Sequence, residues 1–78
     1  MEFQNPSRIP IVSWRDVVKA LKKKGFRIVR EKKHIVMRNN NRIAVIPKHE
    51  EIAKGTLLAI LRQAGISKHE FLELLRDP

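Results

Sequence analysis

Histidine is the side chain best suited to proton transfer near neutral pH, and this chain of 78 residues contains three: His34, His49 and His69. They lack the paired spacing of a zinc site, and the chain has no cysteine to add a thiolate ligand. His49, which lies after a proline on a loop, and His69, in a helix cap, are most simply interpreted as surface polar residues. His34 differs because Lys32 and Lys33 precede it directly. We therefore consider first which chemistry His34 could support.

An imidazole beside cations has the groups that RNA cleavage requires. The 2′-hydroxyl of RNA supplies the nucleophile, a neutral imidazole takes its proton, and neighbouring cations stabilise charge on the phosphate. This chemistry needs no metal, and we expect neither a metal nor another cofactor. A lone surface histidine is more often inert than catalytic, so the residue type alone leaves the role of His34 open.

The positive charge of the chain is concentrated around this histidine. The formal net charge is +9, and the sequence pI is near 10.7. Between Lys19 and Arg42 lie ten of the 17 Lys and Arg residues but one acid, Glu31, whereas the remaining charges cancel. This window favours a polyanionic partner, nucleic acid first and an anionic membrane surface second. The candidate phosphate contacts are Lys23, Lys24, Arg30, Lys32, Lys33, Arg38 and Arg42.

Three short β-rich segments, residues 26–31, 34–39 and 42–47, are expected to position His34. The short polar turns between them predict antiparallel hairpins. Apolar residues alternate along each segment, which is typical of a sheet with one buried face. The residues expected to face inward are Phe26, Ile28, Ile35, Met37, Ile43 and Val45. Because His34 lies three residues before Met37, we expect it on the opposite, exposed face.

Local end signals predict three helices. Ser13 is a typical N-cap for the first, which Gly25 ends; the second begins at Gly55 and ends at Gly65, and Ser67 begins the third. Their expected inward residues are Trp14, Val17, Val18, Leu21, Leu57, Ile60, Leu61, Ala64, Phe71, Leu72 and Leu75. The order α-β-β-β-α-α, with helices on one face of a three-stranded antiparallel sheet, predicts an α+β domain.

The chain length allows one small domain. Residues 1–12 contain two prolines and no helical period, so we expect an extended arm followed by a single domain over 13–78. Ile9, Ile11 and Val12 are candidates for packing the arm on the core. No apolar segment approaches the length of a membrane span, and the N-terminus lacks the layout of a signal peptide. We therefore expect a cytoplasmic protein.

Several strings resemble the HicA toxin family, the small ribonucleases of HicAB toxin–antitoxin modules. The most specific are Lys-Gly-Thr-Leu at 54–57 and Ile-Leu-Arg-Gln-Ala-Gly-Ile at 60–66, followed by Glu-Phe at 70–71. Gly-Phe at 25–26 and Ile-Pro-Lys-His at 46–49 are similar to two further family strings. The resemblance covers nearly the whole chain after the arm.

The resemblance implies a fold similar to a double-stranded-RNA-binding domain and a toxin of a type II module that cleaves mRNA with a histidine. In the family this histidine closes a Gly-Ser-His or Gly-Gly-His string at the start of the second strand, and His34 stands at the matching position. The implied partners are mRNA and a HicB-like antitoxin protein, without a membrane or a small-molecule cofactor.

Lys32 and Lys33 stand where the family has Gly-Ser or Gly-Gly. This departure keeps open a non-catalytic RNA-binding module of the same fold, which would recognise A-form shape through phosphate and 2′-hydroxyl contacts. A third hypothesis is a basic adaptor that binds only an acidic protein. Cleavage of single-stranded RNA in the presence of a chelator would favour the nuclease. A gel shift without cleavage would favour the binding module, and the absence of both would favour the adaptor.

Overall fold

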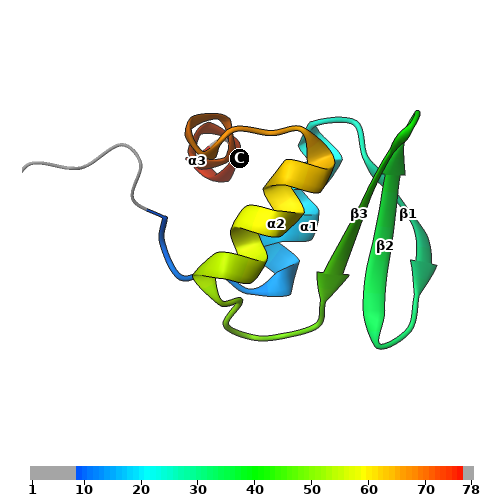
Figure 1. Ribbon diagram of the computed structural model, residues 1–78, viewed down its shortest axis with the longest axis horizontal. Helices are drawn as coiled ribbons and strands as arrows, with labels where there is room; N and C mark the ends of the chain where they lie inside the picture. Colours follow the sequence, from blue (N-terminus) through cyan, green and yellow to red (C-terminus); the bar gives the residue numbers. More distant parts are fainter. Residues whose placement is uncertain (1–8, 77–78) are drawn as a thin grey trace, which may run out of the picture.

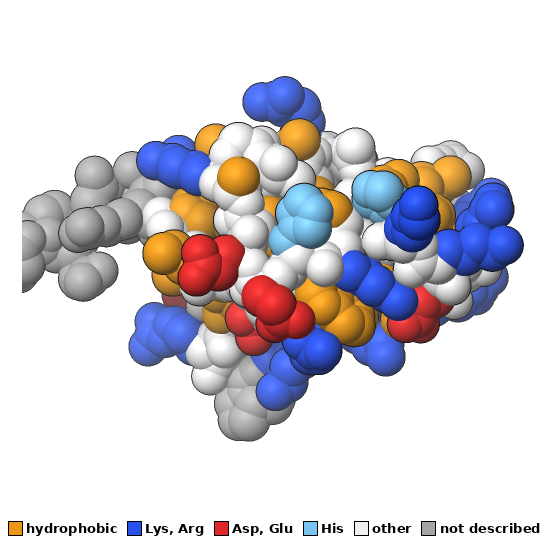
Figure 2. Space-filling model, turned by 90° about the horizontal axis from the view of Figure 1, so that it is seen from below, with side chains coloured by type: hydrophobic (Ala, Val, Ile, Leu, Met, Phe, Trp, Pro, Cys, Tyr) orange, Lys and Arg blue, Asp and Glu red, His pale blue; other side chains and the backbone are white. Residues whose placement is uncertain are grey.

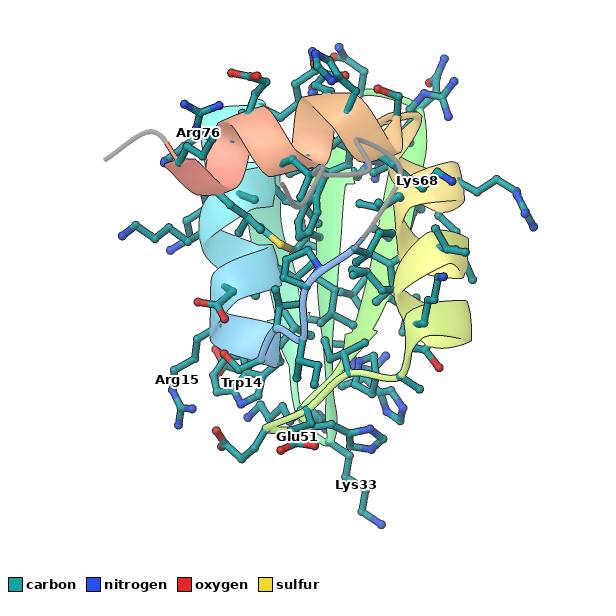
Figure 3. The ribbon with its side chains drawn as sticks, turned by 90° about the vertical axis from the view of Figure 1, so that its left-hand side faces the viewer. Trp14, Arg15, Lys33, Glu51, Lys68 and Arg76 are labelled. Atoms are coloured by element: carbon teal, nitrogen blue, oxygen red, sulfur yellow. The ribbon has the colours of Figure 1, made fainter. Side chains whose placement is uncertain are left out.

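Within residues 9–76, which the computed structural model describes, three helices lie on one face of a three-stranded sheet (Figure 1). The elements are α1 (Trp14–Lys23), β1 (Arg27–Glu31), β2 (His34–Asn39), β3 (Arg42–Pro47), α2 (Lys54–Ala64) and α3 (Lys68–Arg76). The strand order is β1-β2-β3, and both pairings are antiparallel. The α3 helix contacts α1 and α2 and lies across them (Figure 3). The predicted α+β class and element order are confirmed.

Local signals set the ends of α1 as predicted. The Ser13 hydroxyl accepts the backbone N–H of Asp16, and the Asp16 carboxylate accepts the backbone N–H of Ser13, which completes a capping box. After the helix, Gly25 has a φ of 101°, a left-handed value that favours glycine. Leu21 and its apolar neighbours on the inner stripe are buried, while Trp14 at the helix start is half-buried.

The register of β3 differs from the prediction. Residues 40–41 make a tight turn, in which Asn40 has a φ of 56°, and this turn pairs Asn39 with Arg42. Paired residues share a face, so Ala44 and Ile46 lie opposite Met37 and Ile35 on the buried face.

The prediction that Ile43 and Val45 face inward is therefore wrong. Their side chains are 49% and 39% exposed on the face of the sheet that carries no helices, which we call the open face. Residues 43–46 are apolar throughout, so alternation along the sequence could not distinguish the two faces. The pairing with β2 decides between them.

A β-bulge interrupts β1 at Val29. Ile28 pairs with Met37 on the buried face, whereas Arg30 pairs with Val36 on the open face. In a regular strand Arg30 would share the face of Ile28, because they are two residues apart. The extra residue thus turns the Arg30 side chain away from the core.

The last two helices close the core. Four apolar residues of α2 are buried, and Phe71 of α3 is buried among them. The α2 helix begins at Lys54, one residue before the predicted start, and ends at Ala64, with Gly65 as its C-cap at a φ of 73°. The Ser67 hydroxyl accepts the backbone N–H of Glu70 at 3.0 Å, which caps α3 as expected.

The predicted arm is described only in part, because residues 1–8 lie outside the described range. Residues 9–13 form neither helix nor strand. Val12 is buried and Ile9 packs against the core, but Ile11 is 77% exposed and does not pack as expected. Among the described residues, no helix is both long enough and apolar enough to cross a membrane.

Candidate functional site

His34 is the first residue of β2 and lies opposite Pro47 of β3. Its neighbours Ile35 and Met37 are fully buried, while His34 itself is exposed, which confirms its predicted place on the open face. The backbone N–H of Lys32 donates to the His34 carbonyl at 3.0 Å and closes the turn before the strand. Within residues 9–76 the imidazole makes no hydrogen bond or ion pair, so both ring nitrogens are free to meet a ligand.

Three of the predicted cations lie near this histidine. Lys32 and Lys33 form the exposed turn between β1 and β2, and the Lys33 side chain extends into solvent (Figure 3). Arg30 is exposed on the open face because of the bulge. The structure therefore brings an imidazole and three cationic side chains to one corner of the sheet, an arrangement suited to a phosphate group.

Arg38 and Arg42 lie farther from His34. Arg38 shares the open face but stands four residues along β2, a separation of roughly 13 Å. Its Nε donates to the carbonyl of Asn40 at 3.0 Å. Arg42 lies on the same face of β3 as Ala44, the face towards the helices. Its Nη1 donates to the carbonyl of Gln63 at 3.4 Å. Arg38 can extend a phosphate path along the sheet, whereas Arg42 is held at the end of α2.

Lys23 and Lys24 are directed towards α3 instead of the sheet. The Lys23 Nζ donates to the carbonyl of Leu74 at 2.7 Å, and Lys24 forms an ion pair with Glu70. These contacts join the end of α1 to α3. The structure therefore places this predicted pair of phosphate contacts apart from the cations around His34.

Sequence reasoning set aside His49, which the fold brings to the same corner. His34 faces Pro47 across the sheet, and the N–H of His49 donates to the Pro47 carbonyl at 2.8 Å. Seen from this end, the surface of the molecule carries histidine side chains close to lysine and arginine side chains (Figure 2). The sequence contained a signal for this proximity. Counting outwards along both strands from the turn at residues 40–41 pairs position 34 with position 47, two residues before His49.

Trp14 borders this corner at the start of α1. The guanidinium carbon of Arg15 lies 4.6 Å from the centre of the indole ring, and the Lys48 Nζ lies 5.7 Å from it. The Lys48 Nζ is also 3.3 Å from a carboxylate oxygen of Glu31, and Arg15 pairs with Glu50 at 3.1 Å. These ion pairs are exposed and add little stability, but they engage two of the nearby cations.

The open face also carries apolar side chains. Val36, Ile43 and Val45 lie there beside arginines of β1 and β2, and Val29 at the bulge is also 49% exposed. Two surface hollows of about 370 Å³ each adjoin the turn at residues 39–41, at the other end of the sheet from His34. The side chains of residues 30–34 at the His34 corner are exposed, so an extended ligand can reach them.

The fold and the charges define a small basic α+β domain with an exposed histidine at the start of its central strand. A family model described as the HicA toxin of bacterial toxin–antitoxin matches residues 14–66. The chain belongs to this HicA toxin family, and membership implies an antitoxin partner. Among curated proteins, no sequence matches the chain.

Proposed function

We propose that this protein is a metal-independent endoribonuclease that cleaves mRNA in the cytoplasm, as the toxin of a type II toxin–antitoxin module with a HicB-like antitoxin. Family membership supports the toxin role. The observation that carries the nuclease proposal is the exposed His34, free of protein partners among the described residues, beside Arg30, Lys32 and Lys33. These groups support the first part of metal-free RNA cleavage, in which a base takes the 2′-hydroxyl proton and cations stabilise charge on the phosphate.

The proposed reaction begins with the substrate phosphate held by the turn lysines and Arg30. The His34 imidazole takes the proton of the 2′-hydroxyl, and the oxygen attacks the adjacent phosphorus. The bond from phosphorus to the 5′-oxygen breaks, which leaves a 2′,3′-cyclic phosphate and, once that oxygen is protonated, a 5′-hydroxyl. The cations stabilise the negative charge that grows on the phosphoryl oxygens. A base placed in this way contributes about 10²–10⁴-fold to the rate.

The turn before His34 supports a second candidate function. Lys32 and Lys33 replace the small residues of the family string, so bulky cationic side chains flank the histidine. Such a turn suits phosphate binding even without turnover. A non-catalytic RNA-binding module of the same fold is therefore the alternative to the nuclease.

The deciding experiment incubates the purified protein with single-stranded RNA in the presence of a chelator and analyses the ends of the products. The nuclease proposal predicts fragments with a 2′,3′-cyclic phosphate and a 5′-hydroxyl, because the 2′-oxygen is the nucleophile. A gel shift with intact RNA would instead establish the binding module. If the RNA is neither cleaved nor shifted, both functions are refuted.

A further inference from the structure

We infer that His49 is the second catalytic residue of this site, the general acid that protonates the leaving oxygen. The inference rests on the proposed function, in which His34 takes the proton of the 2′-hydroxyl. It follows from the place that the fold gives to His49, from the way its backbone is held, and from a requirement of the reaction that His34 alone does not meet.

That requirement concerns the leaving group. When the 2′-oxygen bonds to phosphorus, the bond from phosphorus to the 5′-oxygen breaks and its electron pair stays on that oxygen. A proton delivered there as the bond breaks avoids a free alkoxide. The products are a 2′,3′-cyclic phosphate and a 5′-hydroxyl, and no water is consumed. The base ends protonated and the acid ends neutral, and exchange with solvent restores both.

The sheet places His49 near His34. Opposed residues of an antiparallel pair have Cα atoms about 4.5–5.5 Å apart, and His34 opposes Pro47. The bond from the His49 N–H to the Pro47 carbonyl, at 2.8 Å, closes a tight three-residue turn over Lys48. This turn keeps His49 close to the strand end. Histidine side chains are present on the surface at this end of the molecule, in agreement with this placement (Figure 2).

The backbone of His49 is held on both sides. Its N–H donates to Pro47, and its carbonyl accepts the N–H of Trp14 at 3.0 Å. The imidazole is exposed and makes no hydrogen bond or ion pair within the described part of the chain. A fixed backbone with a free imidazole is the geometry that a proton donor needs, because its position is set while its ring nitrogens remain available.

Other proton donors at this corner fit the role less well. The Lys48 ammonium lies 3.3 Å from Glu31 and faces the Trp14 ring, so it is already engaged. General-acid catalysis is most effective for groups that titrate near the operating pH, which favours an imidazole over a lysine ammonium. His69 lies on α3, at the opposite end of the molecule (Figure 1).

The test uses an RNA in which a sulfur atom replaces the 5′-bridging oxygen at the cleavage site mapped with the wild-type protein. A thiolate leaves without protonation, so this substrate does not need a general acid. Cleavage rates are measured under single-turnover conditions on the normal and the sulfur-bridged RNA. The proteins are the wild type, His49→Ala, His34→Ala and, as a matched control, His69→Ala, which removes an exposed histidine far from the site.

We expect His49→Ala to lose about 10²–10⁴-fold on normal RNA and to regain nearly the wild-type rate on the sulfur-bridged RNA. His34→Ala should remain slow on both substrates, and His69→Ala should match the wild type on both. Unchanged cleavage of normal RNA by His49→Ala would overturn the inference. An equal loss on the two substrates would also overturn it, because that result indicates a role in binding or folding.

The two proposals fail in different ways in this experiment. A wild-type protein that cleaves neither RNA would refute the proposed function, and the acid role of His49 would fall with it. A wild-type protein that cleaves both, together with a His49→Ala variant that is equally active on both, would leave the nuclease intact and remove only His49 from its mechanism.

Discussion

The backbone N–H of Trp14 donates to the carbonyl of His49 at 3.0 Å, which joins the first turn of α1 to the loop after β3. The first N–H groups of a helix have no partner within the helix, and here the loop supplies one. The start of α1 therefore anchors the segment that carries His49. This contact lies beside the Trp14 ring and its two flanking cations.

Trp14→Pro should weaken cleavage more than Trp14→Ala, by up to about 10²-fold, because displacement of a catalytic group by even 1 Å is costly. Both variants lose the indole ring, but only proline also removes the N–H. Proline is tolerated at the first helical position, and Ser13 already has a compatible extended backbone, with φ −93° and ψ 169°. Cleavage assays on the two variants measure the difference.

Thermal melting is the control for that pair. The lost hydrogen bond costs about 0.5–1.5 kcal/mol, and the stiffer unfolded chain offsets about 0.4–1 kcal/mol of this. The two variants should therefore melt at similar temperatures. Equal cleavage by both would show that the anchor is irrelevant to activity.

His34→Ala should abolish cleavage, with a loss of about 10²–10⁴-fold, because the base is removed. The free energy of unfolding should change by no more than about 0.5 kcal/mol, since the side chain is exposed and has no partner among the described residues. RNA affinity should largely persist, because the cations supply it. Cleavage, RNA binding and thermal melting are measured on the one variant. Cleavage at the wild-type rate would remove His34 from the mechanism.

Replacing Lys32 and Lys33 with glutamate should weaken RNA binding and flatten its salt dependence. Each phosphate contact that is lost reduces the magnitude of the negative slope of log K against log salt by about 0.7 for single-stranded RNA. The control is the double replacement of Lys19 and Lys22 with glutamate, which makes the same charge change on the exposed side of α1. Titrations at several salt concentrations should separate the two variants. An equal effect of both would mean that net charge, and not the turn, governs binding.

The antitoxin should cover the open face next to His34. This face combines exposed valines with arginines, and a tight partner of a basic surface usually supplies acidic groups. The outer edge of β3 is partly occupied, because the Gln63 Oε1 accepts the N–H of Val45 at 2.9 Å and Pro47 has no N–H. We expect protection from hydrogen exchange at the amides of residues 30–42 when the partner is added. Protection confined to α2 and α3 would indicate another mode of neutralisation.

Lysine at position 44 should unfold the protein, whereas lysine at position 43 should be tolerated. Ala44 is fully buried on the helix side of β3, while Ile43 is 49% exposed on the open face. Ala44→Lys buries an unpaired charge, so it should lower the free energy of unfolding by more than the usual range of about 0.5–3 kcal/mol for single substitutions. The loss for Ile43→Lys should lie near the lower end of that range. Urea unfolding of both variants measures the difference. Equal destabilisation would contradict the observed register.

The sequence by itself determined most of the secondary structure and the face of His34. The caps at Ser13 and Ser67, the glycines at 25 and 65 and the apolar periods of the helices all act within a few residues. In β2 the polar residues His34 and Arg38 share one parity, so the sequence directs Ile35 and Met37 to the other face, where both are buried. Local signals of this kind depend on short-range geometry, which a sequence displays directly.

Only the tertiary structure decided the face of β3, the orientation of Arg30 and the meeting of His34 with the His49 loop. The uniformly apolar residues 43–46 leave the strand face undetermined until β2 pairs with it. A bulge is a mismatch between two strands, so neither strand shows it alone. The anchor between Trp14 and His49 joins segments that are distant in the chain, and such contacts exist only once the chain has folded back on itself.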